Sequence, residues 1–217
     1  MKNEAIRATV LSVKIISNVS PEMAKAFNLE SHHKSLGLIT SDIDDVTYTA
    51  LDEATKAADV DVVYAKSMYA GSANASTKLV GEVIGILAGP NPAEVRSGLN
   101  SLLDFVENGA HFVSANDDDS IVYYAHCISR TGTYLSKVAN IKEGEAIAYL
   151  IAPPLEAMYG LDAALKAADV SLAAFYGPPS ETNFGGGLLT GSQSACKAAC
   201  DAFAAAVQFV AENPTAF

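Results

Sequence analysis

Short apolar runs alternate along the chain with segments of helical spacing, and together they predict a mixed fold. The predicted strands are 10–20, 35–41, 59–65, 120–130, 146–154 and 169–175, each rich in Val, Ile, Leu, Tyr or Ala. Helices are predicted over 21–28, 51–60, 131–138 and 161–170. Each half closes with a strand, a Gly turn and a long helix, over 81–108 and 186–213. Strands mixed with amphipathic helices indicate an α/β or α+β fold.

The order of these elements is the same in the two halves of the chain. The segment LDEATKAADV at 51–60 returns as LDAALKAADV at 161–170, with only two of the ten positions changed. The flanking strands and helices match more weakly at a similar offset. Two copies are too few for a solenoid, so the repeat predicts two homologous domains, 1–112 and 113–217, with pseudo-symmetry.

The composition excludes several classes of partner. The formal net charge is −11, which argues against a phosphate-backbone partner and suits a protein that accepts cations. We expect no membrane partner, because no uncharged stretch is long enough to span a bilayer. The amino terminus lacks a secretory pattern, so the three cysteines are expected to be reduced thiols in a cytoplasm.

Recognisable catalytic and metal-binding motifs are absent from the sequence. It contains no P-loop, Rossmann glycine motif, nucleophile elbow or His-Glu-x-x-His segment. Four histidines are scattered without partner spacing, at positions 32, 33, 111 and 126. Cys196 and Cys200 share one helix face but have no third ligand in view, so they are interpreted as small buried residues. Asp117, Asp118 and Asp119 are interpreted as a solvated linker between the copies. We therefore predict neither an enzyme nor a metal site.

Four long segments carry a resemblance to a known family. They are SLGLITSDIDDVTYTALDEATKAADVDVVYAKSMYAG (35–71), GPNPAEVRSGL (89–99), APPLEAMYGLDAALKAADV (152–170) and PPSETNFGGGLLTGSQSACKAACDAF (178–203). They resemble the tandem-domain shell proteins of ethanolamine-utilisation bacterial microcompartments, and the likeness extends over essentially the whole chain. The resemblance implies two circularly permuted shell domains and a homotrimer that imitates a hexagon. It also implies packing with other shell proteins in a microcompartment inside the bacterial cytoplasm.

The resemblance further implies a central pore on the three-fold axis that is gated by loops. The matching segments are 66–80 and 178–188, whose Gly, Ser and Asn residues restrict the backbone little. The gating residues carried over are Tyr69, Gly71, Asn74, Asn183, Phe184, Gly185 and Gly186. A plain surface loop is the alternative for the first segment.

Ethanolamine is a small cation with a hydroxyl group, and the family binds it in small pores within each subunit. Such a site needs carboxylates for the ammonium group, an aromatic face, and a polar group for the alcohol. The matching residues here are Asp44, Asp45, Glu82, Phe112 and Thr182. The resemblance also suggests cobalamin as a transported or bound ligand, although the chain contains no Asp-x-His-x-x-Gly motif.

A second class of function fits the same repeat. A tandem α/β sensor that binds a small cationic metabolite and regulates a partner protein would also have pseudo-symmetric pockets. A shell protein is expected to assemble into hexagonal sheets, whereas a sensor is expected to stay discrete.

Overall fold

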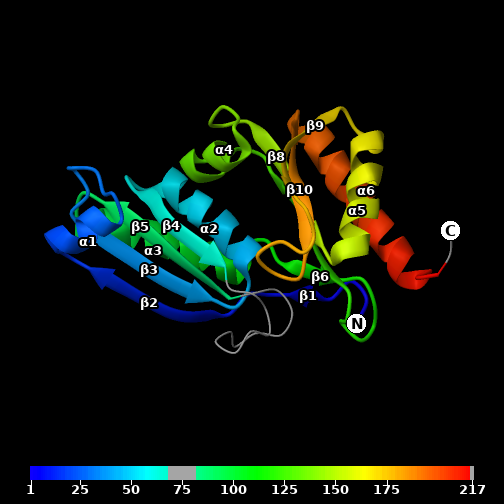
Figure 1. Cartoon of the computed structure of the whole chain (residues 1–217), viewed down its shortest axis with the longest axis horizontal. Coiled ribbons are helices and arrows are strands. Elements are labelled where there is room, and N and C mark those ends of the chain that lie inside the picture. Colours follow the sequence, from blue (N-terminus) through cyan, green and yellow to red (C-terminus); the bar gives the residue numbers. More distant parts are fainter. Residues whose placement is uncertain (68–81, 216–217) are drawn as a thin grey trace. The chain divides into compact units, whose positions relative to one another are not determined.

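The computed structural model of the chain describes residues 1–67 and 82–215 (Figure 1). These residues form two compact units. The first-half unit comprises Arg7–Ala110 together with Gly132–Leu135. The second-half unit comprises Met1–Ile6, His111–Thr131 and Ser136–Phe217.

The first-half unit is a four-stranded antiparallel sheet with helices packed against it. The sheet order is β2 (Val10–Ile16), β3 (Ser35–Ser41), β5 (Val83–Gly89), β4 (Asp61–Ser67). The helices are α1 (Pro21–Ala26), α2 (Asp44–Ala57) and α3 (Pro92–Asn108). The sequence predicted an element of the same type for each of these, but α2 begins at Asp44, well before the predicted start at 51, and β4 continues to Ser67, past the predicted end at 65.

Side-chain alternation along the strands of the first-half unit gives its sheet two apolar faces. Ile39 and Leu87 belong to the main core with residues of α2 and α3, such as Leu51 and Leu102. Helix α2 packs closely on strand β5 at Gly85, where an added Cβ would lie 2.8 Å from a methyl carbon of Leu51. A second, smaller apolar cluster is formed by Leu36, Ile86 and Ala88 at other positions of the same strands. Phe27 and Leu29 pack against it.

Local capping fixes where α3 begins. The Asn91 side chain accepts hydrogen bonds from the backbone N–H groups of Ala93 and Glu94, at 2.9 and 3.0 Å. Pro92 follows at the first helical position, where a missing N–H costs nothing. The Gly-Pro-Asn-Pro sequence thus ends a strand and starts a helix within a few residues.

The second-half unit is built on a six-stranded sheet. Its order is β1 (Ala5–Ile6), β6 (Phe112–Ser114), β7 (Val122–Ile128), β8 (Ala146–Ala152), β10 (Gly185–Gly191), β9 (Val170–Tyr176). The helices are α5 (Pro154–Ala167) and α6 (Gln193–Glu212), together with the part of α4 (Thr133–Ala139) that follows Leu135. The short strands β1 and β6 are the elements that the sequence patterns did not predict.

The two sheets confirm the internal repeat. In the first-half unit the strands run β2-β3-β5-β4, and in the second-half unit the equivalent strands run β7-β8-β10-β9, with antiparallel pairing throughout. The chain order of strands and helices is likewise the same in both copies. The second copy differs by the β1–β6 pair, which extends its sheet beyond β7.

Helix α6 is the main core helix of the second-half unit. Cys196, Cys200, Phe203 and Val207 on it are buried against β7, β8 and α5. The ring of Phe203 lies against α5, since a Cβ added to Gly160 would be 2.7 Å from it. Among the described residues, α6 alone is long and apolar enough to cross a membrane by length and composition. Its buried face is typical of a core helix, which passes the same test.

The domain boundary between 112 and 113 stays a prediction. Each compact unit includes a segment from the other side of this boundary. Strand β1 pairs with β6, so residues 1–6 belong to the second-half unit. Residues 132–135 belong instead to the first-half unit.

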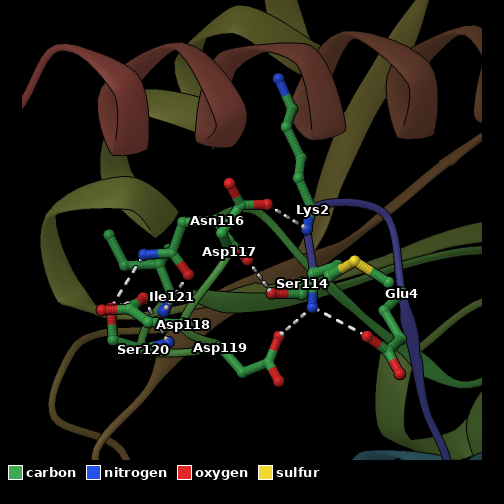
Figure 2. A network of polar contacts seen from close by, with 10 residues as sticks. Lys2, Glu4, Ser114, Asn116, Asp117, Asp118, Asp119, Ser120 and Ile121 are labelled. Atoms are coloured by element: carbon green, nitrogen blue, oxygen red, sulfur yellow. Dashed lines mark hydrogen bonds and ion pairs between the residues drawn. The ribbon is translucent and has the colours of Figure 1, made fainter.

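The Asp117–Asp119 segment is not a linker between the copies, as the sequence suggested, but the turn of the β6–β7 hairpin (Figure 2). Asp117 accepts a hydrogen bond from the backbone N–H of Lys2 at 3.1 Å, and Asp119 lies 3.1 Å from the amine of Met1. Asp118 accepts from the hydroxyl of Ser120 at 2.8 Å. Hydrogen bonds from Ser114 and the terminal amine lower the pKa of Asp119. The acidic turn therefore anchors the first residues of the chain.

Candidate functional site

Two adjacent carboxylates, Asp44 and Asp45, begin helix α2 and are both buried, at 4% and 8% exposure. Asp44 Oδ1 accepts a hydrogen bond from the backbone N–H of Asp45 at 2.9 Å. Their place in the first turn is favourable, because unpaired N–H groups and the helix dipole stabilise negative charge there. The residue before them, Ile43, makes no side-chain cap, so the carboxylates themselves serve this helix end.

Burial has a strong effect on the protonation of this pair. Loss of hydration raises the pKa of Asp44 well above its usual range, and the neighbouring Asp45 carboxylate raises it further. Hydrogen bonds from the Ser67 hydroxyl and the Asp45 amide oppose this shift. Burial also raises the pKa of Tyr48, whose hydroxyl bonds Ser67. The site therefore holds a proton at a pH where isolated aspartates have lost theirs.

Glu82 lies at the same edge of the sheet as the aspartate pair. Val83, the next residue, pairs with Ser41 at the end of β3 and with Ser67 at the end of β4. The chain enters α2 three residues after Ser41. The structure thus brings Asp44, Asp45 and Glu82 to one edge of the first-half unit, and Glu82 is half-buried there.

Phe112 and Thr182, the other two predicted ligands, lie in the second-half unit. Phe112 is fully buried in β6 and stacks on Tyr124 with ring centroids 5.3 Å apart. Its ring centroid lies 6.1 Å from that of Phe184. The Thr182 hydroxyl accepts a hydrogen bond from the Phe184 backbone N–H at 3.3 Å. These two residues are therefore linked through Phe184, and their role as ligands stays a prediction.

Part of the predicted gate lies outside the described residues, namely Tyr69, Gly71 and Asn74. Of the other gating residues, Asn183 is half-buried and Phe184 is buried before β10.

Gly185 and Gly186 are the first residues of β10, which pairs with β8 and, from Gly186, also with β9. A Cβ on Gly186 would lie 1.9 Å from the carbonyl oxygen of Leu150. These glycines thus allow close strand packing, and the loop between β9 and β10 consists of residues 177–184.

Sequence reasoning missed the hydroxyl groups around the acid pair. Tyr48 lies four residues after Asp44 on α2, which places both on one helix face. Its ring centroid is 6.3 Å from that of Tyr134, a residue of the segment that joins the first-half unit. The i, i+4 spacing would have indicated Tyr48 if the helix had been predicted to begin at Asp44 rather than near 51.

The prediction that the cysteines of α6 are small buried residues is confirmed, because Cys196 and Cys200 are both buried. Burial raises the pKa of each thiol, which makes them poor nucleophiles at neutral pH. Two surface hollows of about 450 and 210 Å³ also occur, one in each unit. Neither is lined by any residue of the predicted amine site.

Comparison with known proteins places these features in a family. Residues 35–117 match the BMC domain. Over its whole length the chain is 78% identical to the bacterial microcompartment shell protein EutL of Clostridium perfringens, covering 100% of each. It is 54% identical to EutL of Escherichia coli over 97% of this chain and 96% of the relative. The crystal structure of ethanolamine utilization protein EutL from Leptotrichia buccalis superposes with a TM-score of 0.96 at 71% identity, covering 100% of both chains.

The repeated sheet and the BMC domain define the class as bacterial microcompartment shell proteins with two domains in one chain. A trimeric shell protein, PduB, shows the same fold, with a TM-score of 0.78 over 94% of this chain and 89% of that one at 19% identity. Within this class, the chain belongs to the EutL family. The relatives are named as shell proteins, which agrees with the prediction that the chain is not an enzyme. Family membership also confirms the predicted location, a microcompartment shell in the cytoplasm.

Proposed function

We propose that this shell protein binds ethanolamine at the Asp44–Asp45–Glu82 edge and controls its passage through a trimeric tile. The buried acid pair carries the proposal. Two carboxylates out of contact with water are costly to ionise together, and a bound ammonium group would offset both the lost hydration and their mutual repulsion.

The charge of the site suits an amine better than an anion. The carboxylates supply charge-assisted hydrogen bonds for the ammonium group. The hydroxyls of Ser67 and Tyr48 supply polar partners for an alcohol. An acidic lining of this kind favours cations over anions, as carboxylate rings do in cation channels.

Titration calorimetry of ethanolamine into the full chain tests this proposal. We expect Asp45→Asn and Glu82→Gln to weaken binding by at least about tenfold, since each removes a charged partner worth ~1.5–3 kcal/mol. Asp104→Asn serves as the matched control, because Asp104 is exposed on α3 and bonds only Asn108 among the partners described. Equal affinity in all four proteins would remove the site from this edge.

Exposed apolar side chains support assembly into a trimer and with other shell proteins. On the second-half unit, Leu155, Tyr159 and Phe209 are 61%, 50% and 48% exposed, and the rings of Tyr159 and Phe209 stack at 6.1 Å. Leu172 and Phe175 are exposed on β9, an edge strand of that sheet. Groups of exposed apolar residues of this kind are typical of interaction surfaces.

The mass of the protein in solution tests the assembly proposal. We expect the mass of three chains by light scattering, and hexagonal sheets by electron microscopy at high concentration. A discrete monomer under both conditions would favour the alternative, a sensor that binds a small cation. Two further parts of the proposal come from the family resemblance. They are a pore gated by 66–80 and 178–188, and the passage of cobalamin through that pore.

A further inference from the structure

Two adjacent histidines and an aspartate meet at the other end of β4 from the proposed amine site. His32 and His33 precede β3, and Asp61 is the first residue of β4. Both strands are antiparallel to β5, which lies between them, so β3 and β4 start at the same sheet edge. The turn before β3 crosses the end of β5, where the Lys34 amide bonds the carbonyl of Gly89 at 2.9 Å. This crossing brings the histidines to β4.

The two imidazoles lie side by side because they occupy a turn rather than a regular element. The backbone N–H of His33 bonds the carbonyl of Glu30 at 3.0 Å, which closes the turn. The two ring centroids are then only 4.0 Å apart. In a regular strand or helix, adjacent side chains point to different sides, so the sequence pattern alone gives these histidines no common role.

Donor atoms converge at this position. His33 Nε2 lies 3.1 Å from Asp61 Oδ2, and His32, His33 and Asp61 each offer a donor atom within 4.8 Å of the others. Glu30 Oε2 lies 3.6 Å from His32 Nδ1. In a tetrahedral zinc site with bonds of 2.0–2.1 Å, donors are separated by about 3.3 Å. The carboxylate–imidazole separations therefore already approximate those of a metal centre.

We propose that His32, His33 and Asp61 bind a divalent transition metal of the zinc class, with Glu30 or water as the fourth ligand. Two imidazoles and one or two carboxylates form a donor set that suits Zn²⁺, whereas Mg²⁺ and Ca²⁺ select oxygen ligands. The buried His33 and the half-exposed His32 give the site one rigid ligand and one facing solvent. The bound metal fastens the turn at 28–34 to β4. This site is independent of the proposed amine site.

Metal binding requires a change in the hydrogen bonds of His33. Without metal, Nδ1 accepts a long hydrogen bond of 3.3 Å from the Glu30 amide, so the proton of the neutral ring is on Nε2 and faces Asp61. When zinc binds Nε2, this proton moves through solvent to Nδ1 of the same ring. No net proton leaves His33, and the bond from the Glu30 amide is given up. This cost makes the site weaker than a preformed zinc cage.

Calorimetric titration of ZnCl₂ into the metal-free full chain tests the site. We expect one zinc per chain, and binding weaker by at least about tenfold in His32→Ala and in Asp61→Asn. His32 is the decisive position, because its side chain is 48% exposed and its removal leaves the core intact. His111→Ala is the control, since this histidine belongs to the second-half unit and lies outside the cluster.

Two further measurements separate this site from adventitious binding. Zinc should raise the melting temperature of the wild-type chain but not that of His32→Ala at the same concentration. Cobalt substitution should give visible d–d bands of a tetrahedral N/O site without a thiolate charge-transfer band. The proposal is overturned by a thiolate band, by the absence of stoichiometric binding, or by equal zinc affinity in wild type, His32→Ala and Asp61→Asn.

Discussion

The carboxylate of Asp52 accepts a hydrogen bond from the backbone N–H of Leu135 at 2.8 Å, across 83 positions of sequence. Its other oxygen accepts from the Gly132 N–H at 2.7 Å. Asp52 is fully buried on α2, and burial raises its pKa although these two bonds oppose the shift. One side chain of the first copy thus fixes residues 132–135 to the first-half unit.

Replacing Asp52 with Asn should destabilise the protein by ~1–3 kcal/mol. Both carboxylate oxygens accept from a backbone N–H, and an amide can accept at only one position while its NH₂ group faces the other donor. Urea unfolding measures the change. Asp162→Asn is the control, because Asp162 is exposed and pairs only with Lys166 among the contacts described, so its loss should have little effect. Equal stability of the two variants would contradict a structural role for Asp52.

Gly186→Ala should prevent β10 from packing between β8 and β9. Gly186 has a φ of 155°, and a Cβ there would lie 1.9 Å from the backbone oxygen of Leu150. Because a backbone atom cannot move aside as a side chain does, we expect a loss of about 3 kcal/mol or more. At Gly177 an added Cβ meets only the Phe175 ring, at 3.3 Å, so Gly177→Ala should be mild. Thermal unfolding of both variants compares them, and a small effect at Gly186 would refute the argument.

Most of the fold could be predicted from the sequence because the elements repeat. The identity between 51–60 and 161–170 established two copies, and the strand order of the two sheets confirms them. Strand β6 was missed because three residues cannot show a period, and β1 because its two residues pair with β6 from far away in sequence. The acidic run 117–119 was misinterpreted for a related reason, since only the β6–β7 pairing makes it a hairpin turn.

The candidate site could be predicted only in part. A family resemblance gave Asp44, Asp45 and Glu82, but their common position follows from strand register, which the sequence does not contain. The burial of both aspartates was also unexpected, because carboxylates are seldom buried without a partner. The His32–His33 pair was passed over because the turn that stacks their rings leaves no periodic signal.

The stability of the chain should depend on pH through Asp44. Its pKa in the folded state is raised above 3.8, so folding is favoured while the group is protonated, and this contribution is lost as the pH rises through the raised value. Asp44→Asn cannot ionise, and its stability relative to wild type should therefore improve from about pH 4 toward neutrality. Urea unfolding over a pH series measures the difference between the two proteins. A constant difference across the series would show that the pKa of Asp44 is not raised.

Ethanolamine binding should release a proton from the acid pair. An ammonium group beside Asp44 favours its ionised form and lowers the raised pKa, so the proton passes to the buffer. The observed binding enthalpy should then differ between phosphate and HEPES, whose ionisation enthalpies differ, and affinity should increase as the pH rises. In Asp44→Asn the buffer dependence should disappear even where binding is retained, because no proton remains to be displaced. The same enthalpy for wild type in both buffers, or an unchanged buffer dependence in the variant, would exclude Asp44 as the source of the proton.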